Sequence, residues 1–449
     1  MIPALLVYGA AVLLVGLFAA RRATRSAESF LLGDRSFGFL PTWAGLTSTV
    51  IGGSTTLVLA SLVAENGLPG AWLDIAGALG LLGLGLFLAR RIRETGEVTL
   101  AAVVGRFYGP RVRKVAALLV VLAEIVWFAL LAQATETVVS SLTDWPPTPV
   151  LVGTALLFVA YTALGGQRAV LQTDLLQLGL MVVGIVGVAL PLALTSLSRT
   201  GWPEPLLSFP VGDRFGWTDV GALLVLVGLP HAVGSDVWAK LLSARDAATA
   251  RRAALGAAAA KLVFGAAVVV IAFAGVALEV GGVPQETFPT TVRLLAGPLL
   301  SPLLLVALVA TMQASADSVL LSAAAATSHD LLGGAPARTS RILVVAYGAL
   351  GLLVALGMRD VLATFRLGYA IFASSLILPT LVAFAPRLAL RPRFAGAAML
   401  LGGATTLGAT LLGARLDPVL LGTAVNALVL LPGLSIRGAT GESSVSRGR

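Results

Sequence analysis

Small and hydroxyl-bearing residues interrupt an apolar segment near the start of the chain. Within residues 38–64, Gly52 and Gly53 are flanked on both sides by serines and threonines. Each glycine weakens a helix by roughly 1 kcal/mol relative to alanine, and a backbone group freed inside hydrocarbon needs another partner. A break here would expose carbonyl oxygens to a cation and amides to an anionic group, as in the discontinuous helices of transporters. Close helix packing through small residues is the alternative that this stretch leaves open.

Charged side chains within long apolar segments are the other candidates for chemistry. They are costly in a bilayer and normally face the bundle interior with a partner. Glu124 and Lys261 lie at similar depths, so we expect them to pair if their helices meet. The remaining charged residues of this kind are Asp74, Glu136, Asp174, Asp236, Asp317 and Arg366.

Composition sets the class of protein. Of the 449 residues, 57% are hydrophobic and 12% charged, with a mean hydropathy of +0.94, whereas a soluble domain carries about 25% charged residues. The chain has no cysteine and two histidines, so it offers neither a disulfide framework nor a zinc cluster. The sequence also lacks the phosphate-binding loop of an ATP-driven pump. We expect a membrane protein that is not an enzyme and has no organic cofactor.

The apolar segments predict an all-α polytopic membrane protein with about 13 transmembrane helices, because each approaches the 20 residues that cross a bilayer. The expected spans are residues 2–19, 38–64, 70–90, 114–141, 148–165, 169–196, 218–243, 252–279, 299–329, 340–358, 361–385, 394–413 and 418–434.

The basic residues predict the orientation. If the spans alternate, most of the 31 lysines and arginines fall on one side of the membrane, and such loops stay in the cytoplasm. We therefore expect a multi-pass protein of the inner (plasma) membrane, with the N-terminus outside and the C-terminus cytoplasmic. This bias explains the net charge of +9 without a nucleic-acid partner. The sequence leaves the oligomeric state open.

Four motifs in order resemble the sodium:solute symporter family, which includes sodium/proline, sodium/glucose and sodium/sialic acid transporters. Residues 161–177, YTALGGQRAVLQTDLLQ, are similar to its signature, with Gly165 and Gly166 at a tight turn between two spans. Residues 236–252 and 310–330 resemble the family's seventh-to-eighth and ninth spans, and the stretch around Gly52 resembles its second.

The resemblance implies the inverted-repeat fold first described for a bacterial leucine transporter, with a core of 5+5 helices. The second and seventh spans would be broken; the seventh carries Gly228, Pro230 and Gly234 in its middle. We expect a single transmembrane domain. Its parts are a first span and inside loop (1–37), a first repeat (38–196), an outside loop (197–217), a second repeat (218–385), two further spans (386–436) and a cytoplasmic tail (437–449).

The family's function is secondary active transport, so the resemblance implies sodium-coupled symport of a small polar organic solute by alternating access. The family's shared sodium site maps onto Val50, Gly53, Thr311, Ala314 and Ser315, with Asp174 nearby. Ala314 stands where the family usually has a hydroxyl, so coupling to a proton and uncoupled facilitation stay open. The structural alternatives are that Ser315 bonds to its own helix and that Asp174 pairs with Arg168. A membrane sensor with a separate signalling partner is another alternative.

The resemblance also places candidate substrate residues on the broken helices and on the two spans that flank the outer path. Arg366 could bind a substrate carboxylate, close a gate with Glu136, or extend to the membrane surface. The expected partners are the solute, sodium and the lipid bilayer. The candidate substrate residues are Thr49, Ser54, Thr55, Gln133, Glu136, His231, Arg366 and Tyr369.

Overall fold

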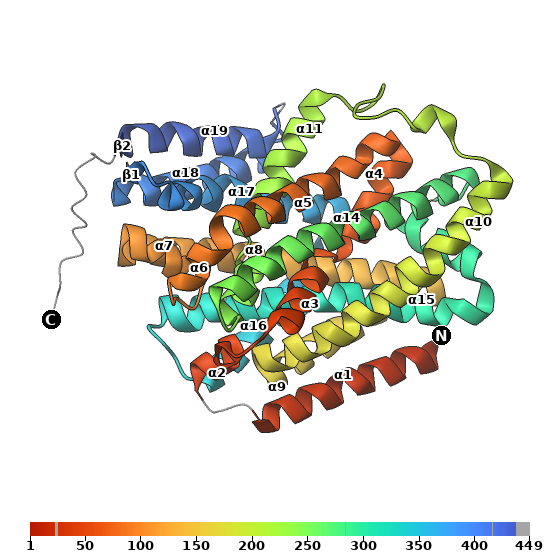
Figure 1. The fold of residues 1–449 in the computed structure, drawn as a ribbon, viewed down its shortest axis with the longest axis horizontal. Coiled ribbons are helices and arrows are strands. Elements are labelled where there is room, and N and C mark those ends of the chain that lie inside the picture. Colours follow the sequence, from red (N-terminus) through yellow and green to blue (C-terminus); the bar gives the residue numbers. More distant parts are fainter. Residues whose placement is uncertain (23–25, 283, 415, 437–449) are drawn as a thin grey trace.

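The computed structural model describes residues 1–22, 26–282, 284–414 and 416–436, and these form a bundle of helices (Figure 1). The first half contains α1 (Ile2–Arg22), α2 (Ala27–Leu32), α3 (Phe39–Val50), α4 (Leu59–Asn66), α5 (Trp72–Gly83), α6 (Ala89–Glu94), α7 (Leu100–Tyr108), α8 (Pro110–Thr143), α9 (Pro147–Met181) and α10 (Leu190–Thr200). The second half contains α11 (Trp217–Leu223), α12 (Leu229–Val233), α13 (Ser235–Ser243), α14 (Ala247–Ala277), α15 (Pro284–Ala325), α16 (Ala337–Gly357), α17 (Val361–Phe384), α18 (Pro392–Leu411) and α19 (Pro418–Leu430).

Several helices continue through π-helical segments, which are η2 (Ser54–Val58), η4 (Leu84–Leu88), η5 (Val182–Ala189), η7 (Leu224–Gly228) and η8 (Ala326–Leu331). Short 3-10 turns are η1 (Gly33–Arg35), η3 (Leu68–Ala71), η6 (Glu204–Leu206) and η9 (Leu431–Gly433). Strands β1 (Leu388–Leu390) and β2 (Leu434–Ile436) pair antiparallel, with Ala389 opposite Ser435.

The apolar segments form helices that suit a bilayer. Within the described residues, nine helices are long and apolar enough to cross a membrane, or ten if the bent pair Phe39–Val50 and Ser54–Asn66 is one span. Two further apolar helices, Pro3–Phe18 and Pro418–Gly433, are shorter. The polytopic α-helical class is therefore confirmed, and the exact number of about 13 spans stays a prediction.

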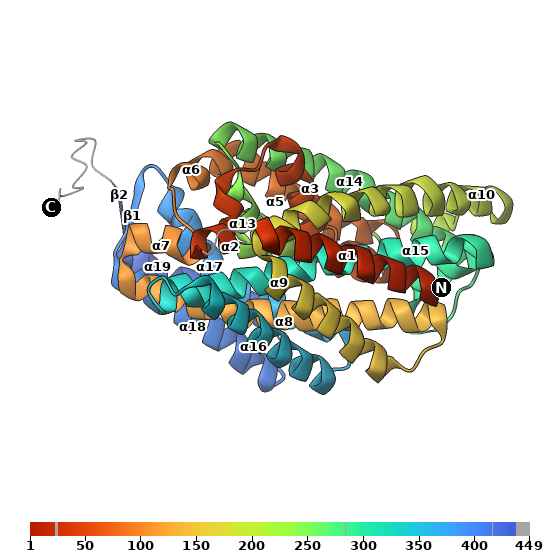
Figure 2. The ribbon, with the colours of Figure 1, turned by 90° about the horizontal axis from the view of Figure 1, so that it is seen from below.

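Part of this difference in number comes from helices that continue across a bend. Residues Pro147–Thr200 form one helical run although two spans are predicted there. Gly166 interrupts it with φ 59° and ψ −162°, a left-handed φ that favours glycine, and the chain folds back at this point (Figure 2). The predicted turn at Gly165 and Gly166 is thus confirmed. Gly297, with φ 60°, interrupts α15 in the same way, so part of the expected loop before residue 299 is helical.

Both predicted helix breaks are present. After Val50, Ile51 leaves the helical region with φ −106° and ψ 41°, and α3 meets the following helix at 53°. In the second half, Gly234 has ψ 132° and separates α12 from α13. Main-chain carbonyls near each break lose their helical partners, so both breaks offer polar backbone atoms inside the bundle.

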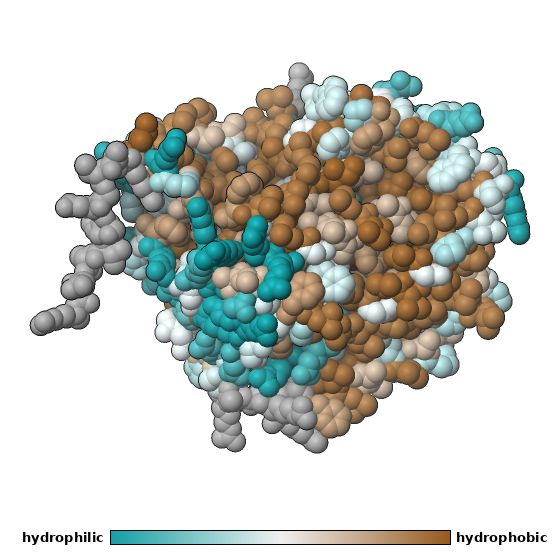
Figure 3. Space-filling view, in the orientation of Figure 1, coloured by the Kyte–Doolittle hydropathy of each residue, from teal (hydrophilic) through white to brown (hydrophobic). Residues whose placement is uncertain are grey.

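One end of the bundle carries a hydrophilic surface with exposed arginines (Figure 3). Figure 1 places α2, α6, α7 and the strands at one end, and the start of α1 and the end of α10 at the other. Hydrophilic side chains gather near α2 and α6, whereas apolar side chains cover the middle (Figure 3). Arg90 and Arg91 are exposed there. In the interior, α15 packs against α8 and α9, and α14 packs against α3 and α5.

Candidate functional site

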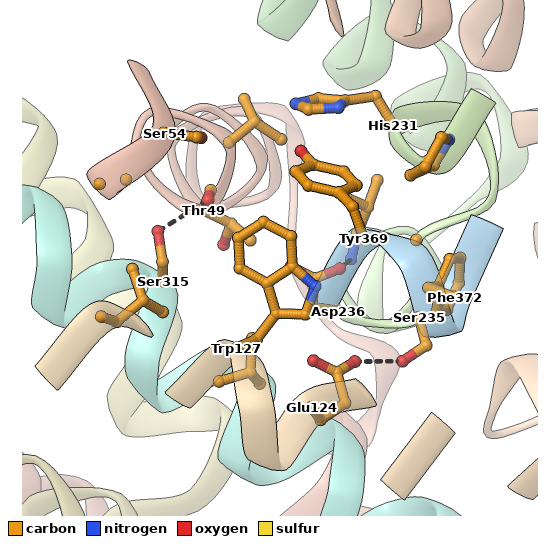
Figure 4. Close-up of a pocket in the computed structure, with 18 residues that line it drawn as sticks. Thr49, Ser54, Glu124, Trp127, His231, Ser235, Asp236, Ser315, Tyr369 and Phe372 are labelled. Carbon is orange, nitrogen blue, oxygen red and sulfur yellow. Dashed lines mark hydrogen bonds between the residues drawn. The ribbon is translucent and has the colours of Figure 1, made fainter. Parts of the chain in front are cut away.

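A cavity of about 70 Å³ lies where the two broken helices meet. Figure 4 shows hydroxyls of Thr49, Ser54 and Ser315 on one side, and Glu124 and Ser235 at one end. The complete lining is Thr49, Val50, Gly52, Gly53, Ser54, Glu124, Trp127, Leu131, Pro230, His231, Gly234, Ser235, Asp236, Val237, Ser315, Val319, Tyr369 and Phe372.

Aromatic rings form a wall of this cavity. Trp127 of α8 meets Tyr369 of α17 edge to face, with ring centroids 4.6 Å apart. Tyr369 also meets Phe365 at 4.7 Å and stacks on His231 of α12 at 6.4 Å. His231 Nδ1 donates to the Val227 carbonyl at 2.8 Å, which fixes the imidazole plane. Aromatic faces carry negative electrostatic potential, so the wall favours a positively charged guest.

Two carboxylates also line the cavity, and no lysine or arginine is among its described lining residues. Glu124 is 4% exposed and accepts a hydrogen bond from the Ser235 hydroxyl through Oε1. Its Oε2 atom has no hydrogen-bond partner within the described part of the chain. Asp236 accepts from the Val237 amide at 2.8 Å. A buried carboxylate oxygen without a partner is costly, so the cavity is suited to a cation.

Four of the predicted substrate residues meet at this cavity, namely Thr49, Ser54, His231 and Tyr369. The sequence did not predict that Trp127, Phe372 and Glu124 would line this cavity. Spacing offered a signal, because Glu124 and Trp127 are three residues apart on one helix and therefore share a face.

The other four predicted substrate residues lie elsewhere. Thr55 is bonded to Asp74 at 3.1 Å, and Gln133 donates to carbonyls at the end of α16, including that of Ala355 at 3.3 Å. Glu136 is partly exposed, and the charged groups that act on it are Arg359 and Glu286 rather than Arg366. These contacts hold Thr55 and Gln133 away from the cavity lining.

Arg366 is exposed on α17, and no ion pair or hydrogen bond forms to it within the described residues. Tyr369, three residues further on, is buried and faces the cavity. A guanidinium at an exposed position can extend toward the membrane surface. Of the three interpretations of Arg366, this exposed position fits the one in which the side chain extends to the membrane surface.

Of the predicted ion ligands, Thr311, Ala314 and Ser315 lie on α15, whereas the Val50 carbonyl oxygen contacts Lys261 of α14 at 2.9 Å. Ser315 Oγ donates to the Thr49 carbonyl at 2.8 Å, so this hydroxyl spans the gap between α3 and α15 rather than bonding only within its own helix. A Cβ at Gly52 would lie 2.5 Å from Ser315 Oγ, which explains the glycine. Thr311 bonds within its own helix to Leu308 at 2.7 Å. A hydroxyl and a carbonyl oxygen are ligand types that suit a hard monovalent cation.

Asp174 forms an ion pair that was not anticipated. Its Oδ2 atom accepts from Lys240 Nζ at 2.7 Å, and both side chains are fully buried. Arg168 pairs instead with Asp34 at 3.1 Å, so the alternative of an Asp174–Arg168 pair is wrong. Lys240 lies in α13, inside the bundle.

Lys261 is the second buried lysine, and the predicted pair with Glu124 is also wrong. Its Nζ atom lies 3.0 Å from Asp74 Oδ1, 2.7 Å from Thr55 Oγ1 and 2.9 Å from the Val50 carbonyl oxygen. The similar depths of Glu124 and Lys261 did not determine which helices meet: α14 packs on α3 and α5, and these helices carry the partners of Lys261.

A polar cavity at the meeting point of two interrupted helices, inside an apolar bundle, is the arrangement of a secondary transporter. The model of the sodium:solute symporter family matches residues 30–199 of the chain, which include the first break and the turn at Gly166.

Two transporters and a solved structure are also similar to the chain. The high-affinity choline transporter 1 of Torpedo marmorata is 28% identical over 74% of this chain and 61% of that protein. The high affinity choline transporter 1 of Homo sapiens is 28% identical over 51% of this chain and 42% of that protein. The chain thus spans less than two thirds of the length of these relatives. Both relatives are transporters by name.

The fold matches that of a Na⁺-coupled sialic acid symporter in a substrate-bound outward-open state. The TM-score is 0.77 at 16% identity, covering 95% of this chain and 96% of that one. This likeness confirms the fold class, and the inverted repeat itself stays a prediction.

Proposed function

We propose that the chain is a sodium-coupled symporter that takes up a small organic cation of the choline type by alternating access. The observation that carries the proposal is the lining of the cavity: two carboxylates and an aromatic wall, with no lysine or arginine in the described lining. The choline transporters among its relatives support the same substrate class.

The cavity offers both interactions that a quaternary ammonium uses. The faces of Trp127 and Tyr369 attract a cation by about 0.5–2 kcal/mol each when it is desolvated. Glu124 Oε2 has no partner among the described residues, so the carboxylate, when ionised, offers a negative charge to a bound cation. A substrate carboxylate would meet only repulsion from Glu124 and Asp236. The substrate is therefore a cation rather than the carboxylate that Arg366 would have bound.

Sodium occupies the gap between α3 and α15 in this proposal. The ligands are the carbonyl oxygens near the α3 break together with Thr311 and Ser315, and Asp174 supplies negative charge nearby. Because the hydroxyl expected at Ala314 is absent, proton coupling and uncoupled transport are the competing mechanisms, and the dependence of uptake on sodium separates them.

We also propose that the start of α1 lies outside and the basic end of the bundle lies in the cytoplasm of a cell with an inner (plasma) membrane. The hydrophilic surface near α2 and α6 supports this orientation (Figure 3). A reporter inserted after Gly96, in the loop beside Arg90 and Arg91, should be active only in the cytoplasm. Periplasmic activity would reverse the orientation.

Uptake into proteoliposomes tests the substrate class and the coupling together. The purified chain is reconstituted, and entry of labelled choline, glycine betaine, proline and glucose is measured with an inward sodium gradient and with an equal potassium gradient. We expect choline to enter with sodium only. Entry of the zwitterions or the sugar without choline would contradict the proposed substrate class, and equal choline entry in potassium would contradict sodium coupling.

A further inference from the structure

The Lys261 side chain extends from the middle of α14 to the break that follows α3. It is 1% exposed, and its ammonium contacts an atom on each side of the break: the Val50 carbonyl oxygen at 2.9 Å and Thr55 Oγ1 at 2.7 Å. Asp74 of α5 completes the set at 3.0 Å. An ammonium has three N–H donors, so these three oxygens satisfy it completely.

This set of oxygens is what a monovalent metal cation would need. A carbonyl freed by a helix break, a hydroxyl and a carboxylate are the ligand types of hard cations. The carboxylate balances the charge, and Thr55 Oγ1 also donates to Asp74 Oδ1 at 3.1 Å. The ammonium thus has the charge and the ligands of a bound ion but is covalently attached to α14.

The surrounding backbone is shaped to admit this lysine. A Cβ at Gly77 of α5 would lie 2.5 Å from Lys261 Cε and 3.1 Å from His231 Nε2. A Cβ at Gly265, one turn after Lys261 on α14, would lie 2.7 Å from Asp74 Oδ2. Glycines therefore make room for both charged groups and let α5 and α14 approach closely.

We infer that Lys261 is a tethered cation: its ammonium permanently fills a monovalent cation position at the α3 break, between Val50, Thr55 and Asp74. An exchanging ion is then confined to the other face of the break, beside Ser315 of α15. Val50 also lines the substrate cavity, so the fixed charge lies directly behind the cavity wall. The inference extends the proposed cation coupling by assigning this position to the protein itself.

Removal of the ammonium should open the position to an ion. The chain contains no cysteine, so Lys261→Cys introduces a single thiol. Binding of ²²Na⁺ to the purified variant should exceed that of the wild type by about one ion per chain. Aminoethylation of the thiol, which restores a tethered ammonium, should abolish the gain, whereas methylthiolation should preserve it; intact mass verifies each modification.

Two control variants identify the origin of the gain. Lys114→Cys removes an exposed lysine at the start of α8 and should bind as the wild type does. Lys261→Cys combined with Asp74→Asn should lose the extra ion, because the carboxylate ligand is gone. Extra binding that persists without Asp74, or no extra binding by Lys261→Cys, would overturn the inference.

Thermal unfolding supplies a second measurement in case the cysteine variant is unstable. Sodium should stabilise Lys261→Ala more than it stabilises the wild type, and N-methylglucamine should stabilise neither. If Lys261→Ala fails to fold in either salt while Lys261→Met with Asp74→Asn folds, Lys261 is only an ion-pair partner and the inference is wrong. Failure of sodium-driven uptake in the wild type would contradict the proposed function but leave this binding comparison intact.

Discussion

Lys261 and Lys240 each end at a buried aspartate, and the two pairs differ in what else surrounds them. Lys261 uses all three donors, on Asp74, Thr55 and Val50. Lys240 has Asp174 at 2.7 Å as its hydrogen-bond acceptor. Near it, Asp174 Oδ1 and Asp317 Oδ2 have no hydrogen-bond partner in the described part of the chain. Asp74 Oδ2 also lacks a partner there, so the two sites differ in charge balance: one carboxylate faces Lys261, whereas two, Asp174 and Asp317, act on Lys240.

The difference indicates separate tasks for the two sites. A charge whose ligands are all satisfied has little reason to exchange partners, and it fixes the helices that supply them. Two carboxylates around one ammonium leave capacity for another cation, and Asp317 lies on α15, the helix that carries the proposed sodium ligands. Sodium should therefore act on the Lys240 region and not on the Lys261 region.

The largest effect is expected when the Lys261–Asp74 ion pair is broken. Lys261→Met leaves the Asp74 charge buried and alone, which costs about 3–5 kcal/mol of unfolding free energy. Adding Asp74→Asn should restore most of this stability. Denaturant titration of both variants in lipid micelles measures the loss. A single variant as stable as the wild type would show that the pair contributes little.

Breaking the second pair should cost less. In Asp174→Asn, Lys240 keeps Asp317 as a nearby negative charge, so we expect a loss of about 1–3 kcal/mol. Sodium affinity should fall as well, because the region loses its negative excess. Isothermal calorimetry of sodium binding measures the second effect. A larger stability loss than in Lys261→Met would reverse the comparison between the two sites.

The sodium ligands on α15 allow a change in each direction. Ser315→Ala removes the hydroxyl that contacts the Thr49 carbonyl, and we expect sodium to bind about tenfold more weakly, or about 1.4 kcal/mol. Ala314→Ser adds a hydroxyl beside it and should tighten binding by a similar factor. Equal sodium affinity in both variants and the wild type would contradict a sodium site in the gap between α3 and α15.

The smallest effect is expected at Arg366. Its side chain is exposed and lacks an ion pair within the described residues, so Arg366→Ala should change stability by less than about 0.5 kcal/mol. Uptake rates should match the wild type. Loss of uptake at normal expression would return Arg366 to the substrate path.

The sequence predicted the helices and their breaks better than it predicted the partners of charged residues. Apolar length and the glycines at positions 52, 166 and 234 depend on local chemistry, and the structure has a bend or break at each place. Partner choice depends on how neighbouring helices rotate and how closely they pack. Lys261 meets Asp74 because Gly77 and Gly265 admit it, and neither glycine carries a sequence signal of that role.

The candidate site shows the same division. Thr49, Ser54, His231 and Tyr369 line the cavity, where the resemblance placed candidate substrate residues. Arg366 lies on α17, the helix of Tyr369, but on its exposed face. The rotation of a helix about its axis, by a fraction of a turn, decides which of its residues face the cavity. The spacing of Trp127 from Glu124 indicated a shared helix face, but the sequence did not indicate that Tyr369 of α17 packs against Trp127.

Sodium-driven choline uptake by Glu124→Gln tests the central claim most directly. The exchange keeps the size of the side chain and the Ser235 contact but removes the negative charge from the cavity. Glu204→Gln, at an exposed residue outside the cavity, is the matched control. We expect the initial rate to fall at least about tenfold in Glu124→Gln, as for a lost charge-assisted contact, and to stay unchanged in Glu204→Gln. Wild-type choline uptake by Glu124→Gln would contradict the assignment of this cavity to an organic cation.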